Sequence, residues 1–200
     1  CLGWVAEQYP HLIRKISDDG HEVAFHSSRH QLAYQQTPDE FRADFRAARD
    51  AIRDATGVAV DTYRIPGFSL TQESIWALDI LGEEGVKVDC SVFPAVRGHG
   101  GLPQFTSAEP CVVQTEQGHS LKELPLNTRS ILGNKVVFSG GGYFRLFPYW
   151  LLKKLFADSE YVMTYFHPRD FDADQPMIPN LSASRRFKSY VGLRGAEEKL

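Results

Sequence analysis

Two histidines stand four positions apart in the segment FHSSRH, residues 25–30, directly after the strand-like run 22–25. Side chains at positions i and i+4 can turn toward the same side of one helical turn, and His26 and His30 could in this way hold one divalent ion. Two surface histidines can adopt the same spacing without any shared function. The other reactive residues of the chain must therefore decide between a metal site and a chance arrangement.

Three further segments that read as strand ends carry reactive side chains. They are Arg64 in YRIPGFS, Asp89 with Ser91 in VDCSVFP, and His167 in TYFHPRDFD. Taken singly, the arginine reads as a turn residue and the histidine as a polar cap. The carboxyl ends of parallel strands, however, meet at one rim of an α/β fold, where ligands bind.

On one rim, this set would suit a metal-dependent hydrolase. A divalent ion lowers the pKa of a bound water toward about 7 and polarises a carbonyl group. A histidine that does not bind the ion can protonate the leaving group, and an arginine can orient a carboxylate through paired hydrogen bonds.

The elements that would position these residues alternate between strands and helices. We expect helices over 4–18, 38–56, 71–84 and 148–157, strands over 22–25, 62–65, 86–93, 121–126, 135–139 and 161–166, and a loop at 95–111. Thr37, Pro38 and Glu40 form the signature of a capped helix start. The alternation is typical of an α/β fold with a mostly parallel sheet, either open or closed into a barrel.

Length and composition indicate one globular domain, with or without a small appendage. The chain has 200 residues, a net charge of −3 and 42% hydrophobic residues. No basic stripe predicts a nucleic-acid partner, and no apolar run reaches transmembrane length. The three cysteines form no CxxC motif, which argues against a disulfide framework or a cysteine zinc site. They fit a reducing compartment, such as a cytoplasm, without fixing the location.

Three motifs carry a resemblance to a known family. They are the H-[S/T]-x-x-H motif at residues 26–30, the segment Arg64-Ile65-Pro66-Gly67, and TYFHP with His167. On them the chain resembles the polysaccharide deacetylase family, the NodB-homology domain of carbohydrate esterase family four. The stretches LGWVAEQYP, YRIPGFSLT, DCSVFP, SGGGYFRLFPYW and YFHPRDFD resemble a bacterial subgroup associated with exopolysaccharide and lipopolysaccharide synthesis. The resemblance covers essentially the whole chain and implies a single domain over residues 1–200.

The resemblance implies a fold and a reaction. The fold is a distorted, TIM-like (β/α) barrel with fewer than eight strands. The reaction is hydrolysis of an N-acetyl group, a non-peptide C–N bond, on an amino sugar in a polysaccharide or its precursor. The implied substrate is an N-acetylated saccharide, and the implied cofactor is a divalent metal, with zinc first.

The resemblance also implies the role of each site residue. His26 and His30 are metal ligands, His167 is the general acid, Arg64 orients the catalytic base, and Asp89 orients His167. Ser27 would steady the loop between the ligands, although a purely structural serine is equally compatible with the motif. The glycine triplet 140–142 would form a loop on the rim. Beside it, Tyr143 and Phe144 would be either sugar-stacking faces or core aromatics.

One feature of the family pattern has no counterpart in the sequence. The family's first strand carries two aspartates, the catalytic base and the third metal ligand, and neither is found among these residues. We therefore expect a domain that is N-terminally incomplete, with little deacetylase activity from these 200 residues alone. An open sheet edge would leave a homo-oligomer as an option. A non-catalytic saccharide-binding or scaffold domain and an amidohydrolase of a small amide are the alternative functions.

Overall fold

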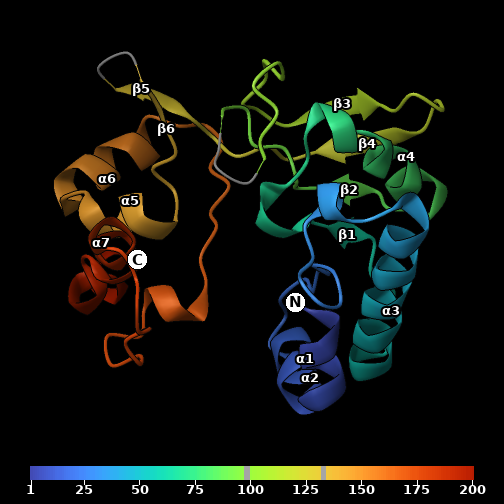
Figure 1. Ribbon diagram of the computed structural model, residues 1–200, viewed down its shortest axis with the longest axis horizontal. Coiled ribbons are helices and arrows are strands. Elements are labelled where there is room, and N and C mark those ends of the chain that lie inside the picture. Colours follow the sequence, from blue (N-terminus) through green and yellow to red (C-terminus); the bar gives the residue numbers. More distant parts are fainter. Residues whose placement is uncertain (97–99, 132–133) are drawn as a thin grey trace. The chain divides into compact units, whose positions relative to one another are not determined.

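The fold is described from a computed structural model, which describes residues 1–96, 100–131 and 134–200. The expected loop at 95–111 lies partly outside these residues. The chain divides into two compact units, Cys1–Pro125 and Leu126–Leu200 (Figure 1). Each unit is described by itself. None of the described helices is both long and apolar enough to cross a membrane.

The first unit contains a four-stranded sheet. Its strands are β1 (Thr62–Tyr63), β2 (Val88–Asp89), β3 (Cys111–Gln114) and β4 (Ser120–Glu123), in the spatial order β1-β2-β4-β3. The pairs β1–β2 and β2–β4 are parallel, whereas β3 is antiparallel to β4. The expected strand at 22–25 is reduced to one parallel bridge between Phe25 and Tyr63. The mixed α/β class is confirmed, but a barrel is not, because the described sheets are small and open.

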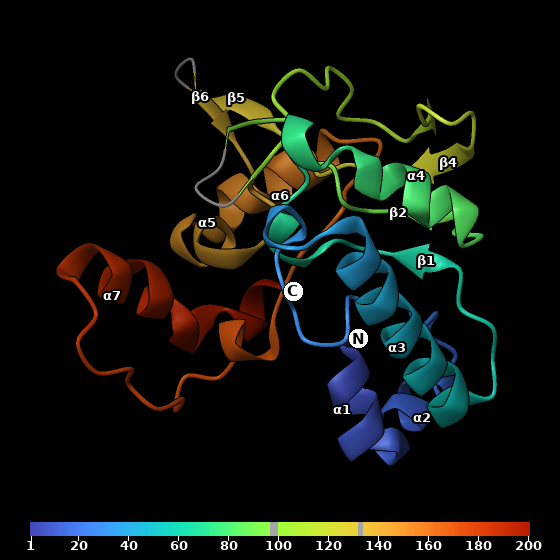
Figure 2. The same cartoon turned by 45° about the vertical axis from the view of Figure 1, so that its right-hand side comes forward.

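Four helices accompany this sheet: α1 (Gly3–Gln8), α2 (Pro10–Asp18), α3 (Pro38–Thr56) and α4 (Trp76–Glu83). Figure 2 shows α1 and α2 lying against α3. The single helix expected over 4–18 is broken at Tyr9, because Pro10 has no N–H to donate and starts a new helix. The capping box of Thr37 and Glu40 is confirmed, and α3 ends at Gly57 in the left-handed conformation, at φ 76°.

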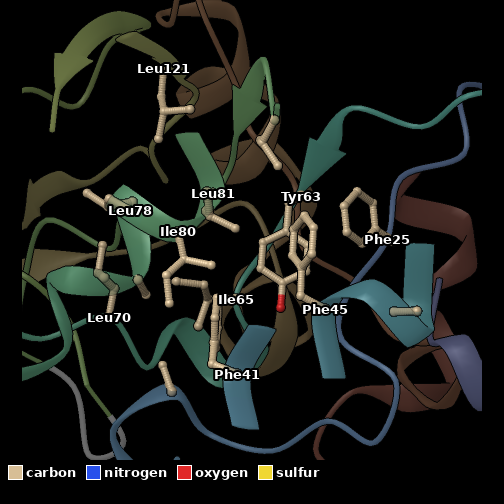
Figure 3. Packing of buried hydrophobic residues seen from close by; sticks show 14 of the residues in the cluster. Phe25, Phe41, Phe45, Tyr63, Ile65, Leu70, Leu78, Ile80, Leu81 and Leu121 are labelled. Atoms are coloured by element: carbon tan, nitrogen blue, oxygen red, sulfur yellow. The ribbon is translucent and has the colours of Figure 1, made fainter. Parts of the chain in front are cut away.

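An aromatic cluster connects the sheet to α3 (Figure 3). The ring of Phe25 lies 4.8 Å from those of both Phe45 and Tyr63, measured between centroids, in tilted or edge-on geometry. Phe41 packs edge-on against Tyr63 at 6.1 Å. All four side chains are buried. The backbone that leads into His26 is therefore held in the core of the first unit by the side chain that precedes it.

The second unit has two short strands, β5 (Arg129–Ile131) and β6 (Asn134–Val136), paired antiparallel, and three helices, α5 (Gly141–Leu146), α6 (Tyr149–Ala157) and α7 (Ala183–Tyr190). The glycine triplet does not form the expected loop but starts α5. The expected strand at 161–166 is one parallel bridge, Gly140 to Tyr165. A Cβ at Gly140 would lie 2.1 Å from the carbonyl oxygen of Tyr165, so this bridge requires a glycine.

Short 3₁₀ turns complete the described chain. They cover Ala33–Gln35, Pro66–Phe68, Gln72–Ser74, Pro168–Asp170, Leu193–Gly195 and Glu197–Lys199. The helix expected over 71–84 is thus a 3₁₀ turn followed by α4. His167 immediately precedes the turn Pro168–Asp170, which gives this residue a fixed backbone setting.

An ion cluster joins α3 to the end of α4. The side chain of Glu84, 6% exposed, accepts hydrogen bonds from Arg42 at 2.9 Å and from Arg46 at 2.6 Å, and Arg49 lies 3.3 Å away. Burial alone would raise the pKa of Glu84, but the hydrogen bonds from Arg46 and Arg42 outweigh it and lower the pKa to about 2. The carboxylate therefore stays charged far into the acid range.

We expect Glu84→Gln to lower the free energy of unfolding at pH 7 by about 1–3 kcal/mol, because charged hydrogen bonds are lost. The folded pKa is below the ordinary value of 4.5, so this stabilisation is present above pH 4.5 and is lost as the pH falls toward 2. Denaturant titrations at pH 7, 4 and 3 should show the two proteins converging as the pH falls. The control is Glu7→Gln, at an exposed position on α1. An equal difference at all three pH values would contradict the assignment.

Candidate functional site

His26 is held by the backbone carbonyl of Arg64, the residue that follows β1. Its Nδ1 lies 2.6 Å from the carbonyl oxygen of Arg64, so Nδ1–H donates and Nε2 of the neutral ring carries no proton. Burial lowers the pKa of His26 to about 3, against this hydrogen bond, which raises it. The imidazole is therefore neutral at physiological pH, which is the state in which a histidine binds a metal ion.

The two histidine rings of the motif are neighbours. Their centroids are 5.0 Å apart and their planes are inclined by 76°. Within the motif, the backbone adopts left-handed φ angles at two residues, Ser27 (φ 67°) and His30 (φ 58°). The buried hydroxyl of Ser27 accepts a hydrogen bond from the His30 N–H at 2.9 Å. This bond gives the loop-steadying role expected of Ser27 a physical basis.

The donor set fits part of a metal site. Two adjacent imidazoles, one with its tautomer fixed by a carbonyl, match two positions of a zinc centre. Among the residues that the structure describes, no group of three His, Cys, Asp or Glu side chains gathers to hold an ion. Catalytic zinc usually has three protein ligands, and His26 and His30 could provide at most two of them.

Arg64 contributes to the site through both its backbone and its side chain. Its carbonyl orients His26, and its Nε donates to the carbonyl of Cys90, just beyond β2, at 3.2 Å. Its guanidinium carbon lies 5.4 Å from the ring centroid of Phe68. The structure thus brings Arg64 next to His26, while its expected role in orienting a catalytic base stays a prediction.

Asp89 lies in the interior rather than at an exposed rim. It is fully buried, and its Oδ1 accepts a hydrogen bond of 2.5 Å from Ser91. The Ser91 hydroxyl in turn accepts from the Ile65 N–H at 2.8 Å. Asp89 and His167 belong to different units, so the expected orienting contact between them stays a prediction.

A second buried carboxyl group, Glu123, accompanies Asp89. Its Oε1 accepts from the Val92 N–H at 3.0 Å. Burial and the nearby charge of Asp89 raise the pKa of Glu123 to about 12, and burial raises that of Asp89 as well. Burial and the nearness of the two carboxyl groups both disfavour the simultaneous ionisation of Asp89 and Glu123. The sequence reasoning missed Glu123, whose only signal is its inward position in the alternating strand β4.

His167 is 59% exposed and has a carboxylate partner in its own unit. Asp170 accepts a hydrogen bond from the His167 N–H at 2.9 Å, and the same oxygen lies 3.5 Å from Nδ1 of the ring. Burial would raise the pKa of Asp170, but the hydrogen bonds from His167 and the charge of Arg145 lower it. The sequence reasoning did not single out Asp170, although its position three residues after His167 is that of a capping partner.

Arg145 connects Asp170 to the C-terminal helix. This buried side chain approaches the Asp170 carboxylate at 3.3 Å and donates to the carbonyls of Lys188 and Ser189, in the last turn of α7. The two candidate sugar-stacking residues behave differently from each other. Phe144 is buried against Phe166, with ring centroids 4.8 Å apart, and belongs to the core. Tyr143 is 47% exposed.

Comparison with known families divides the chain close to residue 90. Residues 1–86 match the polysaccharide deacetylase family, and residues 90–200 match the family described as a domain of unknown function, DUF3473. No curated protein matches the sequence. The histidine motif and Arg64 lie in the first matched region, whereas Asp170, Arg145 and His167 lie in the second.

Solved structures include several that resemble the chain. A protein assigned as a polysaccharide deacetylase from Mycobacterium smegmatis has 25% identity and a TM-score of 0.52, and the match covers 63% of this chain and 38% of that protein. A family 4 carbohydrate esterase from Streptomyces lividans, solved with acetate, has 25% identity, 44% coverage of each chain and a TM-score of 0.40. A family 4 pseudoenzyme from Bacillus anthracis has 22% identity, coverage of 44% of this chain and 30% of its own, and a TM-score of 0.40.

The family assignment follows from the extent of these matches. The match to the M. smegmatis protein spans less than two fifths of that protein's length. The DUF3473 match, in contrast, extends over more than half of the present chain and includes the segment that contains His167. This chain belongs to the DUF3473 family, and its first 86 residues match the polysaccharide deacetylase family.

Proposed function

We propose that this chain carries part of the active site of a metal-dependent deacetylase that acts on an N-acetylated amino sugar in a polysaccharide or its precursor. The observation that carries this proposal is the adjacent pair His26 and His30, with Nε2 of His26 carrying no proton, inside the region that matches the polysaccharide deacetylase family. Synthesis of an exopolysaccharide or lipopolysaccharide is the setting that we infer from the sequence motifs.

The reaction is hydrolysis of an acetamide. Water adds to the acetyl carbon, the C–N bond breaks, acetate leaves, and the amine takes up a proton. A bound divalent ion, zinc in our proposal, would lower the pKa of the attacking water and polarise the acetyl carbonyl. His26 and His30 would hold the ion, and the carbonyl of Arg64 would keep the first imidazole in the correct tautomer.

The remaining roles belong to His167 and Arg64. We infer that His167 protonates the departing amine, because its ring is exposed and its backbone is fixed by the Asp170 carboxylate. Arg64 would orient the carboxylate of a catalytic base through its guanidinium group. In this proposal His167 acts on the leaving group and is not a ligand of the ion.

A non-catalytic saccharide-binding domain is the second candidate. It is favoured by the presence of only two candidate ligands around His26 among the described residues. A binding domain would keep its affinity for the saccharide after loss of the metal, whereas a hydrolase would lose turnover. His167→Ala and His26→Ala in a complete enzyme distinguish these candidates.

The first expected result concerns metal binding. His26→Ala and His30→Ala should each weaken Zn²⁺ binding by the 200-residue chain at least tenfold, because each removes one of two imidazole ligands. Isothermal titration calorimetry measures the affinity, and His21→Ala, at an exposed position outside the motif, is the matched control. If all three variants bind Zn²⁺ as the unaltered chain does, the two histidines do not form the metal site.

The second expected result separates the acid from the ligands. In a complete enzyme that carries this chain, His167→Ala should lower kcat for acetate release from an N-acetylated oligosaccharide by about 10²–10⁴-fold, with the metal content unchanged. His26→Ala should lose both metal and activity. Loss of metal in His167→Ala would make His167 a ligand instead of the acid. Unchanged turnover in both variants would favour the saccharide-binding function.

A further inference from the structure

The loop between the two histidines adopts a conformation that its sequence does not favour. Ser27 and His30 both have positive φ angles, at 67° and 58°, and neither is a glycine. Non-glycine residues adopt this region only where the surrounding structure imposes it. The loop therefore needs contacts from outside its own five residues to keep the two rings at their separation of 5.0 Å.

A carboxylate on α3 contacts two of the loop N–H groups. Asp44 accepts a hydrogen bond from the Ser28 N–H through Oδ2 at 3.0 Å and one from the Arg29 N–H through Oδ1 at 3.1 Å. Charge-assisted hydrogen bonds from a carboxylate are stronger than those between neutral groups. Because both oxygens are used, the carboxylate fixes the position and also the orientation of the loop.

The start of α1 binds two carbonyl groups of the loop. The Gly3 N–H donates to the carbonyl of Ser27 at 3.0 Å, and the Trp4 N–H donates to that of Ser28 at 3.3 Å. A Cβ at Gly3 would lie 3.1 Å from the Cα of Ser28 and 2.7 Å from that of Ala48 on α3. The loop, α1 and α3 therefore meet closely enough at Gly3 that the loop has little freedom to move.

The hydrophobic face of α3 determines where Asp44 lies. Phe41, Phe45 and Ala48 are buried in the core of the first unit, and Asp44 stands between them in the sequence at a half-buried position. Since these side chains fix the rotation of the helix about its axis, they direct the carboxylate toward the loop. Within the described residues, the Asp44 carboxylate accepts hydrogen bonds from the backbone N–H groups of Ser28 and Arg29, so it acts on the histidine rings through the loop.

We propose that Asp44 is a positioning residue for the metal site, which holds His26 and His30 at the separation needed to bind one ion. This proposal rests on the proposed function, in which these histidines are ligands. It assigns to α3 a role beyond packing, because a carboxylate on this helix determines the geometry of a loop that α3 does not contain.

Zinc titration of the 200-residue chain tests the proposal. Asp44→Ala removes both hydrogen bonds and should weaken Zn²⁺ binding by about tenfold or more, the range found when the residues that orient metal ligands are removed. Asp44→Asn keeps the shape of the side chain but only one acceptor oxygen, so its affinity should fall between those of Asp44→Ala and the unaltered chain. Asp54→Ala, which removes a 77% exposed carboxylate from the same helix, should bind as the unaltered chain does.

Thermal unfolding in the absence of metal distinguishes positioning from a general effect on stability. A purely structural role would lower the unfolding temperature of Asp44→Ala while the folded fraction bound Zn²⁺ normally. If Asp44→Ala does not fold, the affinity of Asp44→Asn decides. Normal Zn²⁺ affinity in the folded Asp44 variants, together with its loss in His26→Ala, would overturn the proposal. Normal affinity in His26→Ala would instead overturn the metal site itself.

Discussion

The hydrogen bond between Nδ1 of His26 and the carbonyl of Arg64 is the contact on which the candidate site depends. It requires residues 38 positions apart to lie side by side, and the parallel bridge between Phe25 and Tyr63 provides that arrangement. The bridge depends in turn on the aromatic packing of Phe25, Phe45 and Tyr63. The tautomer of a candidate ligand is thus a consequence of the hydrophobic core directly beneath it.

Local signals in the sequence were sufficient where a single residue type determines the outcome. Thr37 and Glu40 predicted the start of α3, because capping depends on side chains within one turn. Pro10 is a local signal of the same kind, since it favours the first turn of a new helix. The apolar periodicity over residues 4–18 nevertheless predicted one continuous helix. The strands expected over 62–65, 86–93, 121–126 and 135–139 were found but are shorter, those expected over 22–25 and 161–166 are single bridges, and β3 and β5 were not predicted. Periodicity does not show where pairing starts or stops.

The hidden parts of the site depend on contacts between distant residues. Glu123 and Asp89 lie in different strands, and only the register of β2 with β4, which pairs them directly, shows that two carboxyl groups meet in the core. Asp44 lies 16 positions after Ser28, in a helix whose polar residues otherwise read as a solvated face. Neither contact produces a recognisable sequence motif. A carboxylate that accepts from backbone N–H groups can bind almost any residue type at those positions, because the side chains there take no part.

The segment around His167 is supported by residues that follow it. The turn after His167 is fixed by Asp170, and Asp170 is approached by Arg145, whose other donors hold the carbonyls at the end of α7. Lys199 then donates to the carbonyls of Arg145 and Phe147 at the end of α5, at 2.6 and 2.8 Å. Burial of a guanidinium group costs free energy unless its N–H groups form hydrogen bonds. Carbonyls at the end of α7 accept such hydrogen bonds from Arg145. Within residues 126–200, the end of α7 and Lys199 thus hold Arg145 and its helix α5, and Arg145 approaches the Asp170 carboxylate that accepts from the His167 N–H. In the proposed hydrolase, the DUF3473 region would support the turn that carries His167.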